Sequence, residues 1–435
     1  MPDAAGAIAG CLPTPGQRLL LQAALRPAPQ ALEAWRRWER EIGLDRPDEG
    51  SHRLLPLVCR NLAGEASHVP QWQRLKGIHR LAWSRNQVLF NQVRPLIDEL
   101  RRDGVSVLLL KGAALALRVY PDAGCRPMRD VDILVPATSA RALLLKLESA
   151  GWKIACWRPP GFPESFFRFL HAAGFEAPDG ARVDLHWHAL NLCCHRAADD
   201  LFWSHSEPLD FLGIPVRTCS PTEHLLQICT HGIVWSPVPP VRWAADAVLL
   251  LRSTQPAHDF QPAQPGQRSQ PVQPCHPSQP VQPDQPYPPV QPDQPSPAEA
   301  GIDWERLTRT ACDLDLVPYL HSALAFLRRD LDAPVPDEVL DRLAHARASR
   351  SAAIEFARDA DPPAPRTAWQ DLLGFYSRWH RSLGGASPLV HPFGFVRHLQ
   401  YAFEVNSAPA LAGRLARAVV ERLGRRRPVP GRARR

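Results

Sequence analysis

The segment RPMRDVDILVP, residues 126–136, places two aspartates, Asp130 and Asp132, two positions apart in an otherwise apolar run. Polar and apolar residues nearly alternate here, and in a β-strand the side chains at i and i+2 point to the same face. Both aspartates are therefore expected on one face, and the apolar residues on the other. Two carboxylates this close repel each other and are costly to bury without a compensating cation. The segment predicts a strand whose polar face binds a metal ion.

The residues around this segment alternate between strand and helix patterns. Residues 105–110 form a short, almost continuous apolar run, which is typical of a strand buried on both faces, and Lys111-Gly112 follows it. Further helix, helix and strand patterns lie at residues 113–120, 139–150 and 152–157. The alternation predicts a mixed α/β (α+β) fold, in which a small sheet is flanked by N-terminal helices and a helical C-terminal domain.

A hairpin is predicted over residues 167–190, because Asp179-Gly180 is a strong turn dipeptide between two strand-like runs. Alternation along its second arm places Asp184, His186 and His188 on a common polar face. A third carboxylate is thus expected on the sheet, about fifty residues after the first two.

Three carboxylates on two strands, with a glycine turn after a buried strand, are typical of a metal site for nucleotidyl transfer. Mg²⁺ prefers oxygen ligands, and two ions about 3.5 to 4 Å apart can activate an attacking hydroxyl and stabilise the leaving pyrophosphate. We therefore predict that Mg²⁺ or Mn²⁺ is the cofactor and an NTP the substrate. The predicted metal ligands and catalytic residues are Asp130, Asp132 and Asp184. The predicted phosphate-binding residues are Lys111, Gly112, Arg126 and Arg129.

Two stretches carry a family resemblance. LLLKGAALALRVYPDAGCRPMRDVDILVP, residues 108–136, and VDLHWHAL, residues 183–190, resemble the nucleotidyltransferase superfamily of the DNA polymerase beta type. Within it, they are similar to a bacterial family of uncharacterised nucleotidyltransferases. The resemblance implies that Asp130 and Asp132 are the metal-binding pair, that Asp184 is the third carboxylate, and that Gly112 belongs to the nucleotide-binding turn.

Other interpretations of these residues stay open. His186 and His188 could bind zinc with Asp184 in a metal-dependent phosphohydrolase, although hydrogen-bonded histidines on a sheet are commoner. The Gly112-Ala113 turn, which stands where the superfamily has Gly-Ser or Gly-Gly, supports a catalytically inactive nucleotide-binding or interaction module. Three residues on later helices could line the cleft or form a buried Arg-Asp pair, namely His231, Arg242 and Asp246.

The sequence as a whole predicts that the chain is divided into six regions. Residues 255–298 are rich in Gln-Pro repeats, which favours a disordered insertion, and the arginine-rich end favours a solvated, mobile tail over a nucleic-acid site. The parts are a helical N-terminal region 1–103, a nucleotidyltransferase core 104–200, a helical region 201–254, the insertion 255–298, a helical C-terminal region 299–410 and a basic tail 411–435.

No apolar run is long enough to span a membrane, and the first residues lack the basic start of a secretory signal. None of the ten cysteines forms a CxxC pair, which favours free thiols. We therefore expect a cytoplasmic protein without a membrane partner. The acceptor of the nucleotide stays open among a small molecule, a protein and RNA.

Overall fold

The computed structural model describes residues 11–155, 162–233, 240–255, 301–360, 368–383 and 393–425. The expected Gln-Pro insertion at 255–298 therefore lies, except for its first residue, outside the described residues. The same holds for the last ten residues of the expected basic tail, whereas the earlier part of that tail belongs to helix α19, Ala408–Arg425.

A seven-stranded mixed sheet lies at the centre of the described chain, with the strand order β3-β4-β5-β2-β1-β7-β6. Strand β2 pairs in parallel with β5 and antiparallel with β1, and β1 pairs in parallel with β7. This confirms the mixed α/β fold class. The strands are β1 Leu108–Leu109, β2 Val131–Leu134, β3 Lys153–Ile154, β4 Ala172–Glu176, β5 Arg182–His186, β6 Glu207–Phe211 and β7 Ile214–Thr218.

One face of the sheet packs against helix α6, Trp72–Arg102, and helix α8, Ala137–Ser149. Apolar residues of α6 at helical spacing, among them Val93 and Leu100, are buried against the strands. Gly104 has a φ of +73° just after the helix, which is the left-handed conformation that commonly ends helices. The apolar face of β2 and β5 is thereby buried, and the face that carries the aspartates lies on the opposite side.

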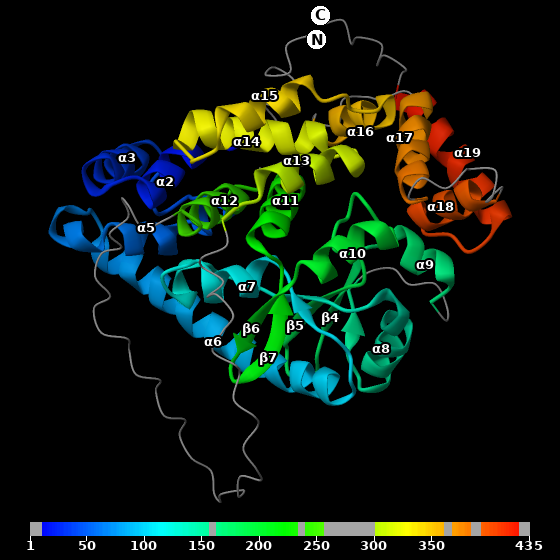
Figure 1. The fold of residues 1–435 in the computed structure, drawn as a ribbon, viewed down its shortest axis with the longest axis horizontal. Helices are drawn as coiled ribbons and strands as arrows, with labels where there is room; N and C mark the ends of the chain where they lie inside the picture. The colour runs from blue at the N-terminus through cyan, green and yellow to red at the C-terminus, as the bar shows by residue number, and fades with distance from the viewer. Residues whose placement is uncertain are drawn as a thin grey trace, which may run out of the picture.

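The opposite side is covered by helix α7, Lys111–Arg118, and by helices α11, Pro221–Gly232, and α12, Arg242–Ser253. Above them lies a helical layer built from both ends of the chain (Figure 1). Helix α2, Pro15–Leu25, contacts α14, Val317–Leu331, and Arg18 forms an ion pair of 2.9 Å with Asp330. The N-terminal and C-terminal helical regions therefore pack together.

The remaining helices complete the layer and its connections. They are α3 Ala28–Glu41, α4 Glu49–His52, α5 Leu55–Asn61, η1 Ala63–His68, η2 Ala123–Cys125, α9 Glu164–Phe169, α10 Arg196–Ser204, α13 Trp304–Asp313, α15 Asp337–His345, α16 Arg350–Ala360, α17 Ala368–Arg381 and α18 Gly394–Ala402. Among the described helices, none is both long and apolar enough to cross a membrane.

Three local expectations differ from the structure. The region 201–254 was expected to be helical, but strands β6 and β7 form a hairpin there and add to the sheet. The strand expected over 105–110 is reduced to β1, Leu108–Leu109. Lys111 and Gly112 form the first turn of α7 instead of a separate loop before it.

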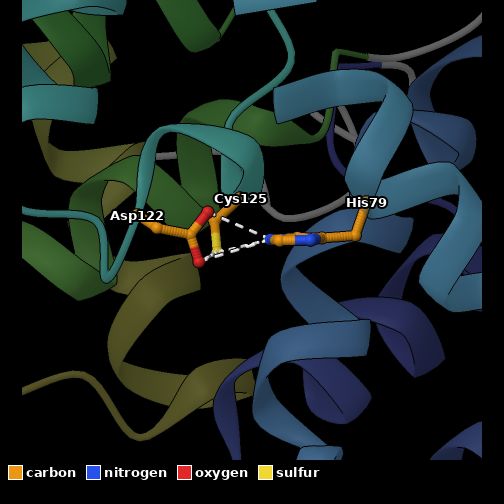
Figure 2. A group of neighbouring side chains, drawn as sticks. All are labelled: His79, Asp122 and Cys125. Carbon is orange, nitrogen blue, oxygen red and sulfur yellow. Dashed lines mark hydrogen bonds and ion pairs between the residues drawn. The ribbon is translucent and has the colours of Figure 1, made fainter. Parts of the chain in front are cut away.

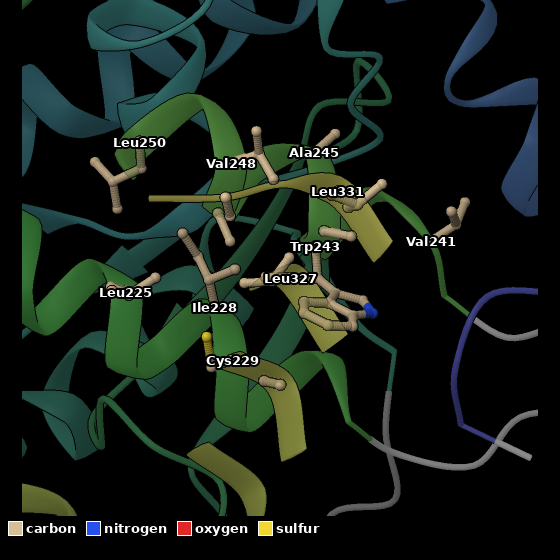
Figure 3. Packing of buried hydrophobic residues seen from close by; sticks show 14 of the residues in the cluster. Leu225, Ile228, Cys229, Val241, Trp243, Ala245, Val248, Leu250, Leu327 and Leu331 are labelled. Carbon is tan, nitrogen blue, oxygen red and sulfur yellow. The ribbon is translucent and has the colours of Figure 1, made fainter. Parts of the chain in front are cut away.

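Helices α11, α12 and α14 pack tightly around Trp243 (Figure 3). The indole of Trp243 lies 5.7 Å from the ring of Phe326, measured between ring centroids. Gly232, the last residue of α11, faces Trp243 so closely that an added Cβ would lie 2.3 Å from the indole Cγ. The contact between α11 and α12 therefore requires glycine at position 232.

We expect Gly232→Ala to destabilise the protein by about 1–3 kcal/mol, because the new methyl group overpacks this contact. The matched control is Gly77→Ala in α6, where nothing lies within 4 Å of the added Cβ. This control is expected to stabilise the helix by about 0.5–1 kcal/mol. Urea unfolding measures both, and equal free energies of unfolding for wild type and Gly232→Ala would contradict the packing.

Candidate active site

Strands β2 and β5 bring two of the predicted carboxylates together. Their parallel register places Asp132 opposite Asp184. The neighbouring apolar residues Val131 and Val183 point into the core on the other face and are fully buried or nearly so. The side chains of Asp132 and Asp184 are 14% and 31% exposed, so the pair is half-buried and solvent reaches it.

His186 and Lys111 both lie against this pair of carboxylates. Nε2 of His186 lies 3.2 Å from Oδ1 of Asp132 and 3.3 Å from Oδ2 of Asp184. Nζ of Lys111 lies 3.5 Å from Oδ1 of Asp132. Burial alone would raise the pKa of Asp132, but the charge of Lys111 and the hydrogen bond to His186 outweigh it and hold that pKa well below its usual range.

The hydrogen bonds also act on the histidine. Burial would lower the pKa of His186, but its hydrogen bonds to Asp132 and Asp184 outweigh burial and raise the pKa. Its Nδ1 is buried and has no hydrogen-bond partner among the described residues. His186 therefore uses Nε2 to orient both carboxylates.

Asp130 lies just before β2 and is exposed. Loss of solvent around its carboxyl group, and then the charges of Asp132 and Asp184, raise the pKa of Asp130. The charges of the three carboxylates thus disfavour their joint ionisation unless a cation is present, although Asp130 does not belong to the group of ligand atoms that Asp132, Asp184 and His186 form. The hard oxygen donors of the carboxylates fit Mg²⁺, and Asp132, Asp184 and His186 already offer ligand atoms within 4.8 Å of one another.

The first turn of α7 approaches the carboxylates closely. Lys111 has a φ of +30°, a rare backbone conformation for a residue with a side chain, and such strain clusters at functional sites. A Cβ at Gly112 would lie 3.0 Å from Nη1 of Arg126 and 3.6 Å from Oδ2 of Asp132. Glycine at this position therefore lets the helix backbone pack beside the carboxylate cluster.

The two predicted phosphate-binding arginines have other partners. Arg126 binds Asp246 through both Nε and Nη2, at 2.8 Å each, and the hydroxyl of Tyr120 donates to the same carboxylate at 2.6 Å. Only Nη1 of Arg126 lacks a hydrogen-bond partner in the described chain. Arg129 is exposed and lies 2.8 Å from Oε1 of Glu49. Arg126 thus uses the bidentate geometry that was expected for phosphate to bind Asp246 instead.

Asp246 therefore belongs to a buried Arg-Asp pair, but its partner is Arg126, before β2, and not Arg242 of the later helices. Arg242 donates to the carbonyl of Pro127, and burial, followed by the charge of Arg126, lowers the pKa of Arg242 to about 10. His231 instead lines the hollow beside Lys111. The charge of Lys111, and then burial, lowers the pKa of His231 to about 3.

His188 does not join the carboxylate cluster. Its Nδ1 lies 2.7 Å from Oδ2 of Asp199, and its Nε2 lies 2.8 Å from the carbonyl oxygen of Phe167. Both ring nitrogens are therefore engaged in hydrogen bonds. This geometry matches the expectation of a hydrogen-bonded histidine and leaves the zinc set of His186, His188 and Asp184 without one of its ligands.

Further polar residues near the site were not recognised in the sequence. The hollow beside Lys111 is also lined by His171, Asn191, Gln227 and Thr230. The rings of His171 and His186 are 5.2 Å apart between centroids. The hairpin offered a signal for His171, because pairing on either side of Asp179-Gly180 places Ala172 opposite His186. The other three residues lie on segments without a recognisable motif.

Comparison with protein families agrees with the class of protein that the carboxylates indicate. Residues 50–265 match the model of a family described as uncharacterised nucleotidyltransferase. A crystal structure of an antigenic nucleotidyltransferase-like protein from Paracoccidioides brasiliensis is similar over 39% of this chain and 77% of that chain, with 18% identity and a TM-score of 0.28. The search of curated proteins found no match.

We expect Asp246→Ala to destabilise the protein by about 3–5 kcal/mol, because it leaves the guanidinium of Arg126 buried without its partner. The matched control is Asp45→Ala, which removes an exposed ion pair with Arg74 and should leave the unfolding midpoint nearly unchanged. Denaturant unfolding followed by circular dichroism measures both variants. An unchanged midpoint for Asp246→Ala would show that the pair does not hold α12 to the segment before β2.

Proposed function

We propose that this protein is a Mg²⁺-dependent nucleotidyltransferase that transfers a nucleoside monophosphate from an NTP to an acceptor. The proposal rests on one observation above all, the register that sets Asp132 beside Asp184 on the polar face of the sheet. The charges of Asp132 and Asp184 raise the pKa of Asp130. The match of residues 50–265 to a nucleotidyltransferase family model supports the same class of reaction.

In the proposed reaction, a nucleophilic oxygen or nitrogen of the acceptor attacks the α-phosphorus of the NTP. The bond between the α-phosphorus and the bridging oxygen breaks, and pyrophosphate leaves with its electron pair. Mg²⁺ or Mn²⁺ held by Asp130, Asp132 and Asp184 would supply positive charge for the phosphate oxygens and activate the nucleophile. Asp184 would accept the proton of the acceptor hydroxyl.

The neighbouring groups have roles that follow from their contacts. His186 holds the carboxylates of Asp132 and Asp184 in position through Nε2. Lys111 pairs with Asp132 and has a flexible side chain, so we propose that it turns to the β- or γ-phosphate when a cation takes over its charge. Because Gly112 has no side chain, the backbone of α7 lies beside Asp132, so we propose that its first turn lies near the phosphates of a bound NTP.

The acceptor would bind beside the hollow formed by Lys111, His171, Asn191 and His231. Burial lowers the pKa of His171 well below its usual value. A small molecule, a protein side chain and an RNA end all remain candidates for the acceptor.

A second candidate function is nucleotide binding without turnover. The observation that favours it is the ion pair between Lys111 and Asp132, which already occupies the position where the phosphate-binding lysine and the metal ligand would act. Ala113 also offers no hydroxyl to a phosphate. Such a module would bind an NTP with Mg²⁺ and transfer nothing.

We expect Asp132→Asn and Asp184→Asn to lower transfer of label from α-³²P-NTPs at least about 100-fold, since even outer partners of metal ligands are commonly worth about 10–100-fold. The assay supplies Mg²⁺ or Mn²⁺ and a cell extract as the source of acceptor. Asp98→Asn is the matched control, because Asp98 pairs with Arg102 on α6, on the other side of the sheet.

Each outcome of this assay separates the candidates. Label transferred by wild type and Asp98→Asn alone supports the enzyme. Transfer at wild-type rates by Asp132→Asn contradicts the proposed metal site. If no protein transfers label but wild type binds ATP in a Mg²⁺-dependent manner by calorimetry, the nucleotide-binding module replaces the enzyme.

A further inference from the structure

A second cluster of ligand-type side chains lies outside the candidate active site, where α6 meets the short helix η2. His79 comes from α6, and Asp122 and Cys125 come from the turn around η2 (Figure 2). Nε2 of His79 lies 3.0 Å from Oδ1 of Asp122. Sγ of Cys125 lies 3.4 Å from Oδ2 of Asp122 and 3.9 Å from Nε2 of His79. Three different donor atoms thus converge on one point.

These separations match those around a tetrahedral zinc ion. With metal bonds of about 2.3 Å to sulfur and about 2.0–2.1 Å to nitrogen and oxygen, tetrahedral angles place the donor atoms about 3.3–3.6 Å apart. The observed separations deviate from that range by only a few tenths of an ångström. Small rotations of the side chains would therefore accommodate a metal ion.

The packing of the turn also brings the donors together. A Cβ on Gly124 would lie 2.9 Å from Nε2 of His79 and 2.9 Å from Oδ1 of Asp122. The backbone amide of Gly124 donates to the same oxygen at 2.7 Å, which fixes the carboxylate. The absence of a side chain at position 124 therefore permits the close approach of the turn to α6.

The three side chains differ in their exposure to solvent. Cys125 is 1% exposed, and burial, followed by the charge of Asp122, raises the pKa of its thiol well above its usual value. A thiol in this position is a poor nucleophile, which argues against a catalytic cysteine. The side chains of His79 and Asp122 are 20% and 33% exposed, so an ion and a water ligand can reach the cluster from solvent.

We propose that His79, Asp122 and Cys125 form a Zn²⁺ site, with water as the fourth ligand. Zn²⁺ accepts this mixture of nitrogen, oxygen and sulfur donors, whereas Mg²⁺ prefers the oxygen-rich set at Asp132 and Asp184. Binding releases the thiol proton of Cys125 to solvent, and Nε2 of His79 binds the ion with its lone pair while the ring proton sits on Nδ1. The ion ties α6 to the turn that precedes Arg126.

The test uses the full chain, stripped of metal, with Co²⁺ as the probe and excess Mg²⁺ to occupy the oxygen-rich site. We expect wild type to bind one equivalent of Co²⁺ with tetrahedral visible bands and a sulfur-to-cobalt charge-transfer band, and Zn²⁺ to displace it. Cys125→Ser should lose the charge-transfer band, and His79→Gln should bind at least about tenfold more weakly. The matched controls are Cys312→Ser and His345→Gln, at exposed positions away from the cluster.

Wild type by itself can overturn the proposal. If it shows no sulfur-to-cobalt band at one equivalent, the three residues form only a hydrogen-bonded cluster, and this result needs no folded variant. A band that survives in Cys125→Ser but disappears in Cys312→Ser would also overturn it. Loss of the band in Cys125→Ser alone, with both controls unchanged, supports the site.

Discussion

The register between β2 and β5 is the constraint on which both the fold and the site depend. It places Val131 opposite Val183 in the core and, one residue later, Asp132 opposite Asp184 on the polar face. Because side chains alternate along a strand, a slip by one residue would turn the carboxylates into the apolar core. Burial of the apolar face therefore specifies the positions of the charged pair. The charge of Lys111 and the hydrogen bonds of His186 offset the repulsion within this pair.

The helical layer controls the segment that leads into β2. Arg126 binds Asp246 on α12 with two hydrogen bonds, and Tyr120 and Arg242 complete this buried group. The ion pair costs desolvation and is stable because its geometry is bidentate and every oxygen of Asp246 is used. Since Asp130 follows Arg126 by four residues, its position depends on α12. The matched family segment, residues 50–265, contains both partners of this pair.

The sequence predicts the parts of this protein that depend on local patterns. The alternation around Asp130 and the turn at Asp179-Gly180 predict β2 and the β4–β5 hairpin, and both are present. The sequence does not predict the β6–β7 hairpin, because its turn is Leu212-Gly213, with φ of +52° and +82°, in place of the usual Asn-Gly or Asp-Gly. The partner of Arg126 lies 120 residues away, and no local pattern encodes such a contact.

The cluster of His79, Asp122 and Cys125 could not be predicted from the sequence for the same reason. Its members come from a helix and a turn, and His79 and Asp122 are 43 residues apart. The position of this cluster connects α6 to the segment that leads into β2. Asn86, about two turns further along α6, donates to the carbonyl of Arg126 and accepts from the amide of Met128. Helix α6 thus contacts the segment before β2 at two places. One contact is the pair of hydrogen bonds of the Asn86 amide, and the other is the cluster of His79, Asp122 and Cys125. Residues 122–132 contribute Asp122 and Cys125 to the proposed sulfur-containing set and Asp130 and Asp132 to the proposed oxygen-rich set. Because the two sets are so close along the chain, the chemistry of their donors would decide which metal ion each one selects.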